Sequence, residues 1–329
     1  MRRTATAVAL ILFTGVFAHA QQPAGVLIAG NKRANTVSIV DLATGRGLAE
    51  LPTPPGPHES AVSHDGRWGV ITGYGAQQPG NTLVLLDLNA HTAVRTIDLG
   101  EYRRPHGIAF LPGDSVIAET VEANQAVLLV HRERGVLRAI RTGEQTTHQM
   151  AVHPAGTLGY TANIRSGSIS EVNFATGAVR TLAVAPEVEG IGVTPDGREV
   201  WVGSNTAGTI SIVDVPSWSV KATLDQGERP YRVTISPDGK LAAAALTIRS
   251  RIRLIDVATR REVALMEAPD GAQPVGMTWS PDGARLYVAC QGINAIAEFD
   301  IATRRLTRTI AVGDGPDGVA VAERPTARR

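Results

Sequence analysis

Cysteine is almost absent from this sequence of 329 residues, which contains only Cys290. A single cysteine leaves no internal disulfide, and no CxxCH haem motif is present. Cys290 lies in an apolar stretch, so we expect a buried small hydrophobic side chain rather than a reactive thiol. Packing between elements must therefore hold the fold together.

Charge is also scarce, and several catalytic signatures are missing. Charged residues make up 19% of the chain and the net charge is +1. No strong field is available to attract nucleic acid or an anionic membrane. The sequence has no GxSxG, P-loop, HExxH or dinucleotide-binding motif, which argues against a serine hydrolase or a nucleotide-dependent enzyme.

Long apolar runs are missing beyond the N-terminus. There, Met1-Arg2-Arg3 is followed by an apolar run, Ala5 to Phe17, and by Ala18-His19-Ala20, a small-x-small cleavage pattern. This order predicts a signal peptide over residues 1–20, with Gln21 first in the mature chain. A membrane anchor is the alternative, but the run is too short to span comfortably. We therefore expect a periplasmic or secreted protein without stable membrane insertion.

Glycine, in contrast, is abundant, with 34 residues, and some of it recurs periodically. The stretch from residue 276 to 316 shows one period. Apolar strands are expected at 276–280, 286–289, 295–300 and 306–312, and Pro281-Asp282-Gly283 forms a tight turn after the first. Equivalent turn glycines are Gly66, Gly113, Gly156, Gly197, Gly239 and Gly283, at intervals between 41 and 47 residues.

The count of repeats indicates how the chain closes. A polar residue ends the third strand seven times, whereas the turn glycine appears six times, so one repeat is split. The chain begins with strands two to four, over residues 25–51, and ends with an unpaired first strand at 318–322. We predict an all-β, seven-bladed β-propeller with four antiparallel strands per blade. It forms a single domain over residues 21–329, with one blade shared by the two termini and a disordered tail from about residue 323.

The repeat resembles the YVTN-type β-propeller repeat of bacterial and archaeal cell-envelope proteins. The resemblance rests on Ser-Pro-Asp-Gly, Leu-Tyr-Val-Ala, a strand ending in Asp and a strand ending before Gly and Pro. Its best matches are residues 280–316, 194–213, 236–260 and 37–45. The pattern departs at Pro112-Gly113-Asp114 and at His131. The resemblance implies the propeller fold, but it is weak for function because such propellers carry several activities.

The recurrent aspartates have a structural interpretation. Each one stands just before a turn, where a carboxylate can accept backbone N–H bonds from residues two or three positions later. We expect no catalytic role for them. The third-strand set is Asp41, Asp87, Asp214, Asp256 and Asp300, and the first-turn set is Asp65, Asp196, Asp238 and Asp282.

One repeated position is different, because its residue type varies and includes three histidines. It directly follows the connection between blades, on the face where a propeller's channel opens. Its occupants are His58, His106, His148, Glu189, Tyr231, Val275 and Asp317. We expect these residues, here called the mouth ring, to surround the entrance of the central channel.

Imidazoles and carboxylates that converge in this way can bind Zn, Cu, Fe or Ni. We expect His58, His106, His148 and Glu189 to be metal ligands, with Glu189 alternatively a general base and Asp317 orienting His58. Further residues on this face could hold a small ligand, together with Tyr231. They are Arg103, Arg104, Arg229, Asn31, Asn163 and Asn205.

Three functional interpretations remain open. The first is an exported propeller that binds a small ligand or an envelope protein at the channel mouth. The second is a metal-dependent enzyme of the lyase, lactonase or oxidase type, working through the histidine arc. The third is a structural envelope protein. In each case we expect a monomer that does not bind nucleic acid.

Overall fold

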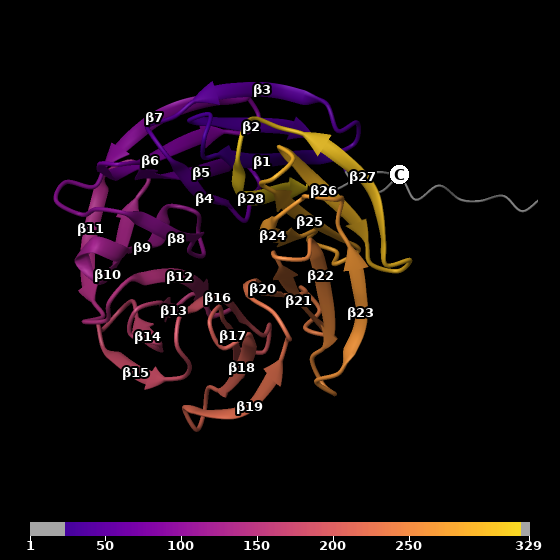
Figure 1. The fold of residues 1–329 in the computed structure, drawn as a ribbon. Helices are drawn as coiled ribbons and strands as arrows, with labels where there is room; N and C mark the ends of the chain where they lie inside the picture. Colours follow the sequence, from indigo (N-terminus) through magenta and orange to yellow (C-terminus); the bar gives the residue numbers. More distant parts are fainter. Residues whose placement is uncertain (1–23, 324–329) are drawn as a thin grey trace, which may run out of the picture.

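The computed structural model describes residues 24–323, which form seven four-stranded antiparallel sheets. Figure 1 shows the sheets arranged as blades around a central axis. The predicted all-β, seven-bladed propeller is therefore confirmed. Within these residues the only helix is the 3-10 helix η1 (Glu122–Asn124).

Blade 1 combines strands from both ends of the chain, and blades 2 to 4 follow it in sequence order. Blade 1 consists of β28 (Pro316–Glu323), β1 (Gly25–Asn31), β2 (Thr36–Asp41) and β3 (Gly47–Pro52). Blade 2 consists of β4 (Pro57–Val62), β5 (Trp68–Gly75), β6 (Pro79–Asp87) and β7 (Thr92–Asp98). Blade 3 consists of β8 (Pro105–Phe110), β9 (Val116–Val121), β10 (Ala126–His131) and β11 (Gly135–Arg141). Blade 4 consists of β12 (Thr147–Val152), β13 (Leu158–Asn163), β14 (Ser168–Asn173) and β15 (Val179–Ala183).

The remaining three blades complete the circle. Blade 5 consists of β16 (Val188–Val193), β17 (Glu199–Ser204), β18 (Thr209–Asp214) and β19 (Ser219–Asp225). Blade 6 consists of β20 (Pro230–Ile235), β21 (Leu241–Leu246), β22 (Arg251–Asp256) and β23 (Glu262–Glu267). Blade 7 consists of β24 (Pro274–Trp279), β25 (Arg285–Cys290), β26 (Ala295–Asp300) and β27 (Arg305–Ala311).

Blade 1 is assembled from both ends of the chain, as predicted. The last strand, β28, pairs with the first, β1, in antiparallel register, with Val26 opposite Ala322 and Ile28 opposite Ala320. β28 also contacts the inner strands β24 and β4 of the neighbouring blades. The pairing closes the ring and removes the strand edge that β1 would otherwise expose.

The first strand of every blade lies innermost, and these seven strands approach one another closely. A Cβ atom added at Gly276 would lie 2.0 Å from the carbonyl oxygen of Asp317, and one at Gly318 would lie 2.3 Å from that of His58. No side chain fits in such a gap. Glycine at these positions allows the inner strands to enclose a narrow channel.

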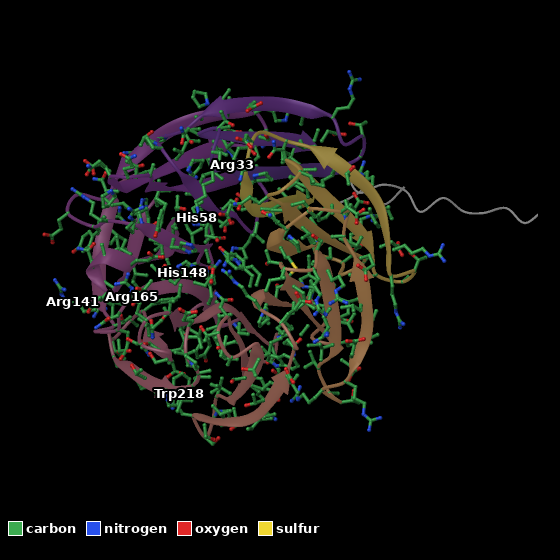
Figure 2. The ribbon with its side chains drawn as sticks, in the orientation of Figure 1. Arg33, His58, Arg141, His148, Arg165 and Trp218 are labelled. Carbon is green, nitrogen blue, oxygen red and sulfur yellow. The ribbon has the colours of Figure 1, made fainter. Side chains whose placement is uncertain are left out.

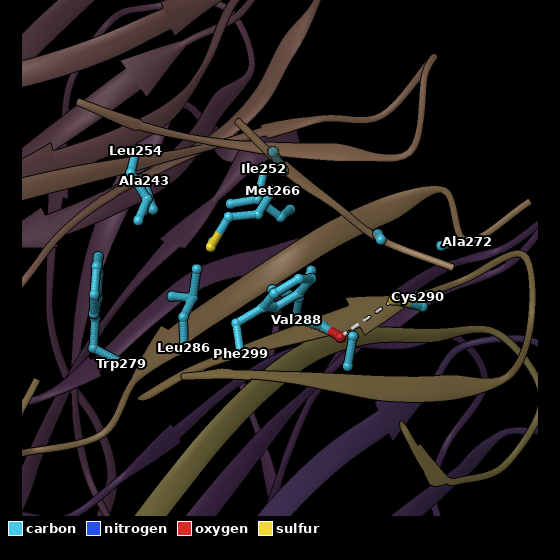
Figure 3. Close-up of a cluster of buried hydrophobic side chains, with 13 residues drawn as sticks. Ala243, Ile252, Leu254, Met266, Ala272, Trp279, Leu286, Val288, Cys290 and Phe299 are labelled. Carbon is cyan, nitrogen blue, oxygen red and sulfur yellow. Dashed lines mark hydrogen bonds between the residues drawn. The ribbon is translucent and has the colours of Figure 1, made fainter. Parts of the chain in front are cut away.

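Apolar side chains fill the spaces between neighbouring blades. Figure 3 shows one such cluster, in which Leu254 and Met266 of blade 6 face Leu286 and Phe299 of blade 7. Cys290 belongs to this cluster and is completely buried, and burial raises the pKa of its thiol to about 12. The expectation of an inert, buried cysteine is therefore confirmed.

The turn aspartates act within their own repeats. At the first-strand turn of blade 7, Asp282 accepts hydrogen bonds from Ser280 Oγ at 2.6 Å and from Ala284 N at 2.9 Å. After the third strand, Asp300 accepts bonds from Thr303 N and Thr303 Oγ1, both at 2.7 Å. The structural interpretation of these aspartates agrees with this geometry.

The departures from the repeat keep these functions. His131 replaces aspartate at the end of β10, and its Nδ1 accepts a bond from Glu133 N at 3.1 Å. Asp114, in the irregular turn of blade 3, accepts instead from His64 N of blade 2 at 2.8 Å. The hydrogen bond of Asp114 thus connects two blades, whereas the equivalent aspartates bond within their own repeat.

Two expectations concern residues outside the described part of the chain. The predicted signal peptide, residues 1–20, and residues 324–329 of the predicted tail both fall there. Between residues 24 and 323, no helix has the length and hydropathy to span a membrane.

Candidate functional site

The mouth ring occupies the second position of each inner strand, at the end where that strand begins. His106 is completely buried, and His58, His148 and Glu189 are at most 7% exposed. Figure 2 shows His58 and His148 beside the central opening of the propeller. The fold therefore brings residues from separate blades, far apart in sequence, to one end of the channel.

An irregularity in the inner strands adds a second set of residues to the channel. The register of β4 against β5 shifts between Pro57 and Ser60, and that of β20 against β21 shifts between Pro230 and Arg232. Such bulges let two successive residues turn toward the same side of a strand. Glu59 and Arg232, which directly follow mouth-ring residues, enter the channel in this way.

Arg232 links blades on opposite sides of the channel. Its Nη1 donates to Glu189 Oε1 of blade 5 at 3.1 Å, and its Nη2 donates to Glu59 Oε1 of blade 2. Burial opposes the charge, but Glu59, Tyr231 and Glu189 together raise the pKa of the guanidinium. A permanent cation is therefore fixed near the channel axis, and a cavity of about 130 Å³ lies next to it and Glu59.

A third set of residues lies above the mouth ring, at or just after the end of each second strand. The backbone N–H of this residue bonds to the carbonyl just before the inner strand. Glu122 N, for example, donates to Arg104 O at 3.1 Å, and Asn205 N donates to Glu187 O at 3.0 Å. The members of this set that contact the mouth ring are Lys32, Tyr74, Glu122 and Asn205.

His148 is held between two carboxylates. Its Nδ1 forms a short hydrogen bond with Glu122 Oε1, and its Nε2 lies 3.3 Å from Glu189 Oε1. Burial opposes protonation most strongly, but the bonds and charges of the two carboxylates outweigh it and raise the pKa of His148. The two carboxylates therefore favour the imidazolium form of His148.

Glu189 accepts bonds from three directions. Besides His148, Arg232 and Asn205 Nδ2 donate to it. Burial raises the pKa of this carboxyl, but these donors outweigh burial and hold the pKa at about 2. A carboxylate this acidic accepts protons poorly, so its geometry suits a ligand or a support better than a general base.

His58 has a different environment. Lys32 Nζ lies 2.9 Å from its Nε2, and burial, followed by the charge of Asp317 acting in the opposite sense, leaves its pKa at about 3. Since a lysine ammonium only donates, Nε2 is the acceptor and Nδ1 carries the hydrogen. Nδ1 lies 3.1 Å from Asp317 Oδ2, although the two groups fall short of hydrogen-bond geometry.

His106 lies between these two histidines and has no hydrogen-bond partner among residues 24–323 at either ring nitrogen. Its ring centroid is 4.3 Å from that of His58 and 3.5 Å from that of His148. Burial, followed by the charge of His148, holds its pKa well below the usual value. A buried neutral imidazole without partners is costly for a folded protein and calls for a ligand.

The ligand atoms around His106 are close enough to share an ion. In one group, atoms of His106, Glu122 and His148 all lie within 4.8 Å of one another, and in the other the atoms belong to His58, Glu59 and His106. Nitrogen and oxygen donors of this kind suit first-row transition metals.

The other expected site residues are distributed as follows. Arg104 stacks on Tyr74, with 4.6 Å from Cζ to the ring centroid, and Arg229 stacks on Tyr231 at 4.7 Å. Val275 is buried in an apolar cluster. Arg103 bonds to the loop carbonyl of Gly100.

The three asparagines differ in their surroundings. Asn205 reaches the mouth ring through Glu189. Asn163 bonds instead to Ser168 at 3.1 Å and Ser170 at 2.9 Å within blade 4, and Asn31 bonds to Thr36 and Ser38 within blade 1, each at 2.9 Å. Both of these side chains are completely buried and stabilise their own hairpins.

Five residues of the cluster were missed from the sequence: Lys32, Glu59, Tyr74, Glu122 and Arg232. Two alignment signals could have found them. The residue after each mouth-ring position gives Glu59 and Arg232. The residue at or just after the end of each second strand gives Lys32, Tyr74 and Glu122.

Comparison with known proteins places the chain in a family. The family model described as the choice-of-anchor I domain matches residues 81–314, so the chain belongs to this family. Membership indicates a cell-surface or secreted protein. Among curated proteins, none matches the chain.

Two solved structures are similar in fold. A chain of Kuenenia stuttgartiensis hydrazine synthase superposes with a TM-score of 0.73 and 18% identity, covering 89% of this chain and 99% of that one. A functionally unknown protein from Desulfotomaculum acetoxidans superposes with a TM-score of 0.76 and 14% identity, covering 91% and 99%. At such identities the likeness concerns the propeller fold alone.

Proposed function

We propose that this member of the choice-of-anchor I domain family is an exported protein that binds a transition metal ion at its channel mouth. The observation that carries the proposal is His106, whose two ring nitrogens are buried between two other histidines and have no hydrogen-bond partner within residues 24–323. His106, His148 and Glu122 are the proposed ligands, with a further position left toward the mouth for a small ligand. Zn, Cu, Fe and Ni all suit this set of donors.

The charges of the cluster support a divalent ion. When His148 is protonated, three cationic groups, Lys32, Arg232 and His148, stand against four carboxylates. The carboxylates are Glu59, Glu122, Glu189 and Asp317. Binding of a divalent cation with loss of the His148 proton would therefore bring the cluster to neutrality, which favours binding in a buried site.

The geometry favours binding over catalysis. Glu189, the candidate base, is held by three donors and has a pKa of about 2. Lys32 occupies Nε2 of His58 and leaves the hydrogen on Nδ1, beside Asp317, so His58 is not among the proposed ligands. We also propose that the repeats are of the YVTN type and that cleavage near Ala20 releases the mature protein into the periplasm or the medium.

The test is metal analysis of the purified mature protein after dialysis against Zn²⁺ or Co²⁺. We expect about one ion per chain, with a Co²⁺ absorption spectrum typical of nitrogen and oxygen ligands. His106→Ala should weaken binding by about 100-fold or more, since it removes a direct ligand. An intact mass that begins at Gln21 tests the cleavage in the same preparation.

His91→Asn is the matched control. His91 lies in the turn between β6 and β7, far from the mouth ring in its repeat, and its φ of 56° is one that asparagine tolerates. This variant should bind metal like the wild type. A wild-type protein that retains no metal, or a folded His106→Ala protein with unchanged affinity, would contradict the proposal.

A further inference from the structure

A separate pocket of about 250 Å³ lies beside the histidine cluster, between blades 3 and 4. Four short segments form it: the connections that lead into β8 and β12, and the turns that follow β9 and β13. Its lining residues are Arg104, Glu122, Ala123, Gln125, Gln145, Thr146 and Arg165. Figure 2 labels Arg165 on the same side of the propeller as His148.

The polar side chains of this pocket are available to a ligand. Among residues 24–323, the side chains of Arg165, Gln125 and Thr146 form no hydrogen bond or ion pair, and neither does that of Gln145. Arg104 is held in place by its stacking on Tyr74 and by a bond from Nη2 to Ala76 O at 3.1 Å. The pocket therefore presents guanidinium, amide and hydroxyl donors with few internal acceptors.

Its backbone is held in an unfavourable conformation. Arg104, Gln125 and Thr146 have φ values of 59°, 53° and 57°. This left-handed region is rare for residues other than glycine, above all for a β-branched threonine. The same backbone position also has a positive φ at Glu187 in blade 5 and Gln273 in blade 7, and it is glycine in blades 1 and 2. The conformation is therefore a feature of the repeat rather than of this pocket.

The charge of the pocket specifies the ligand. Two arginines face one carboxylate, Glu122, and that carboxylate is already engaged by His148 and by Tyr74 Oη at 2.7 Å. One positive charge is left over, which a single carboxylate group neutralises, whereas a phosphate dianion would exceed it. Guanidinium groups bind carboxylates through paired N–H donors.

We propose that this pocket binds a small organic monocarboxylate, with its carboxylate group on Arg165 and Arg104. The inference extends the proposed function and rests on it in one respect: Glu122 belongs to both sites, so the bound molecule would lie next to the metal ion. The amide and hydroxyl donors of Gln125, Gln145 and Thr146 would face the polar remainder of the ligand.

The experiment measures binding of lactate by calorimetry or NMR titration, with inorganic phosphate as the comparison anion. We expect a dissociation constant in the millimolar range for lactate and weaker binding for phosphate. Arg165→Gln should weaken lactate binding about tenfold, and Arg165→Lys should weaken it less. Arg165 is exposed and forms no internal bond, so both variants should fold.

Arg141→Gln is the matched control, because Arg141 is an equally exposed arginine that does not line the pocket. It should bind lactate like the wild type. The titrations are done with both metal-free and Zn²⁺-loaded protein, so failure of the metal site leaves the pocket measurable. Absence of lactate binding in both forms, or equal affinity of the wild type and Arg165→Gln, would overturn the inference.

Discussion

The two ends of the inner strands differ in how strictly they repeat. At the far end, Ser236 and Asp238 of blade 6 form the same bonds as Ser280 and Asp282 of blade 7. At the mouth end, the equivalent residues range from histidine to valine. Most far-end bonds connect residues of the same repeat, so the same residues recur in most blades, with Asp114 of blade 3 as an exception.

At the mouth end the bonds connect different blades, as between Arg232, Glu59 and Glu189. The type of residue there is constrained by contacts with neighbouring blades rather than by bonds within its own repeat, so it can vary from blade to blade. The difference shows that a cluster of interacting side chains can form where the repeat varies without disturbing the turns that hold each blade.

Removing β28 should disturb both the mouth end and the far end of the inner strands, and we expect it to have the largest effect on stability. A chain that ends at Gly315 loses the strand that pairs with β1, together with the buried side chains of Val319 and Ala322 and the mouth-ring residue Asp317. We expect loss of cooperative thermal unfolding, monitored by circular dichroism, because β1 becomes an open edge. A chain that ends at Glu323 is the control, and equal melting temperatures would contradict the role of ring closure.

Replacing Arg232 should disturb the mouth end alone. Arg232→Met leaves Glu59 and Glu189 buried with less compensation, and we expect a loss of about 3–5 kcal/mol of unfolding free energy in urea titration. The double variant Glu59→Gln with Arg232→Met should recover part of it.

Arg33→Met provides the comparison on the same face, since Arg33 forms an exposed ion pair with Asp314 at 2.9 Å. Such pairs contribute less than about 1 kcal/mol. If Arg232→Met were no more destabilising than Arg33→Met, the charge network at the mouth would not be a stabilising unit.

Replacing a single far-end aspartate should have the smallest effect. Ser236 Oγ, Lys240 N and the Lys240 ammonium hold the pKa of Asp238 at about 2. Asp238→Ala should cost less than about 1 kcal/mol, because the carboxylate is largely exposed. The lowered pKa means that this stabilisation is present above about pH 4 and is lost as the pH falls toward 2.

The stability difference between wild type and Asp238→Ala should therefore shrink over that range of pH, while metal binding at neutral pH stays unchanged. A difference that stays constant on acidification would show that the turn bonds do not depend on the charge of the carboxylate.

The sequence predicted the fold well because each blade carries its own strand and turn signals. The turn Pro281-Asp282-Gly283 and the third strand ending at Asp300 are both local features, and their recurrence predicted seven blades and the shared one. The mouth-ring positions could be found for the same reason, since each follows a connection of similar length.

The partners of the mouth-ring residues were harder to predict. Simple strand alternation would point Glu59 away from the channel if His58 points into it, and only the register shift in β4 turns both inward. Arg232 and Glu59 are 173 positions apart in sequence, and no local pattern predicts their contact. Asn163 was expected on the ligand face, but its side chain is directed into its own hairpin by two serines.

The shared blade also determines when folding can be completed during synthesis. β1 is among the first strands to be synthesised, yet its partner β28 is completed only when residue 323 has been added. Until then β1 has one unpaired edge, and the inner strands β4 and β24 lack a neighbour between them. Pairing across almost the whole chain makes this the slowest contact to form. We therefore expect the nascent protein to expose an edge open to aggregation until β28 is complete.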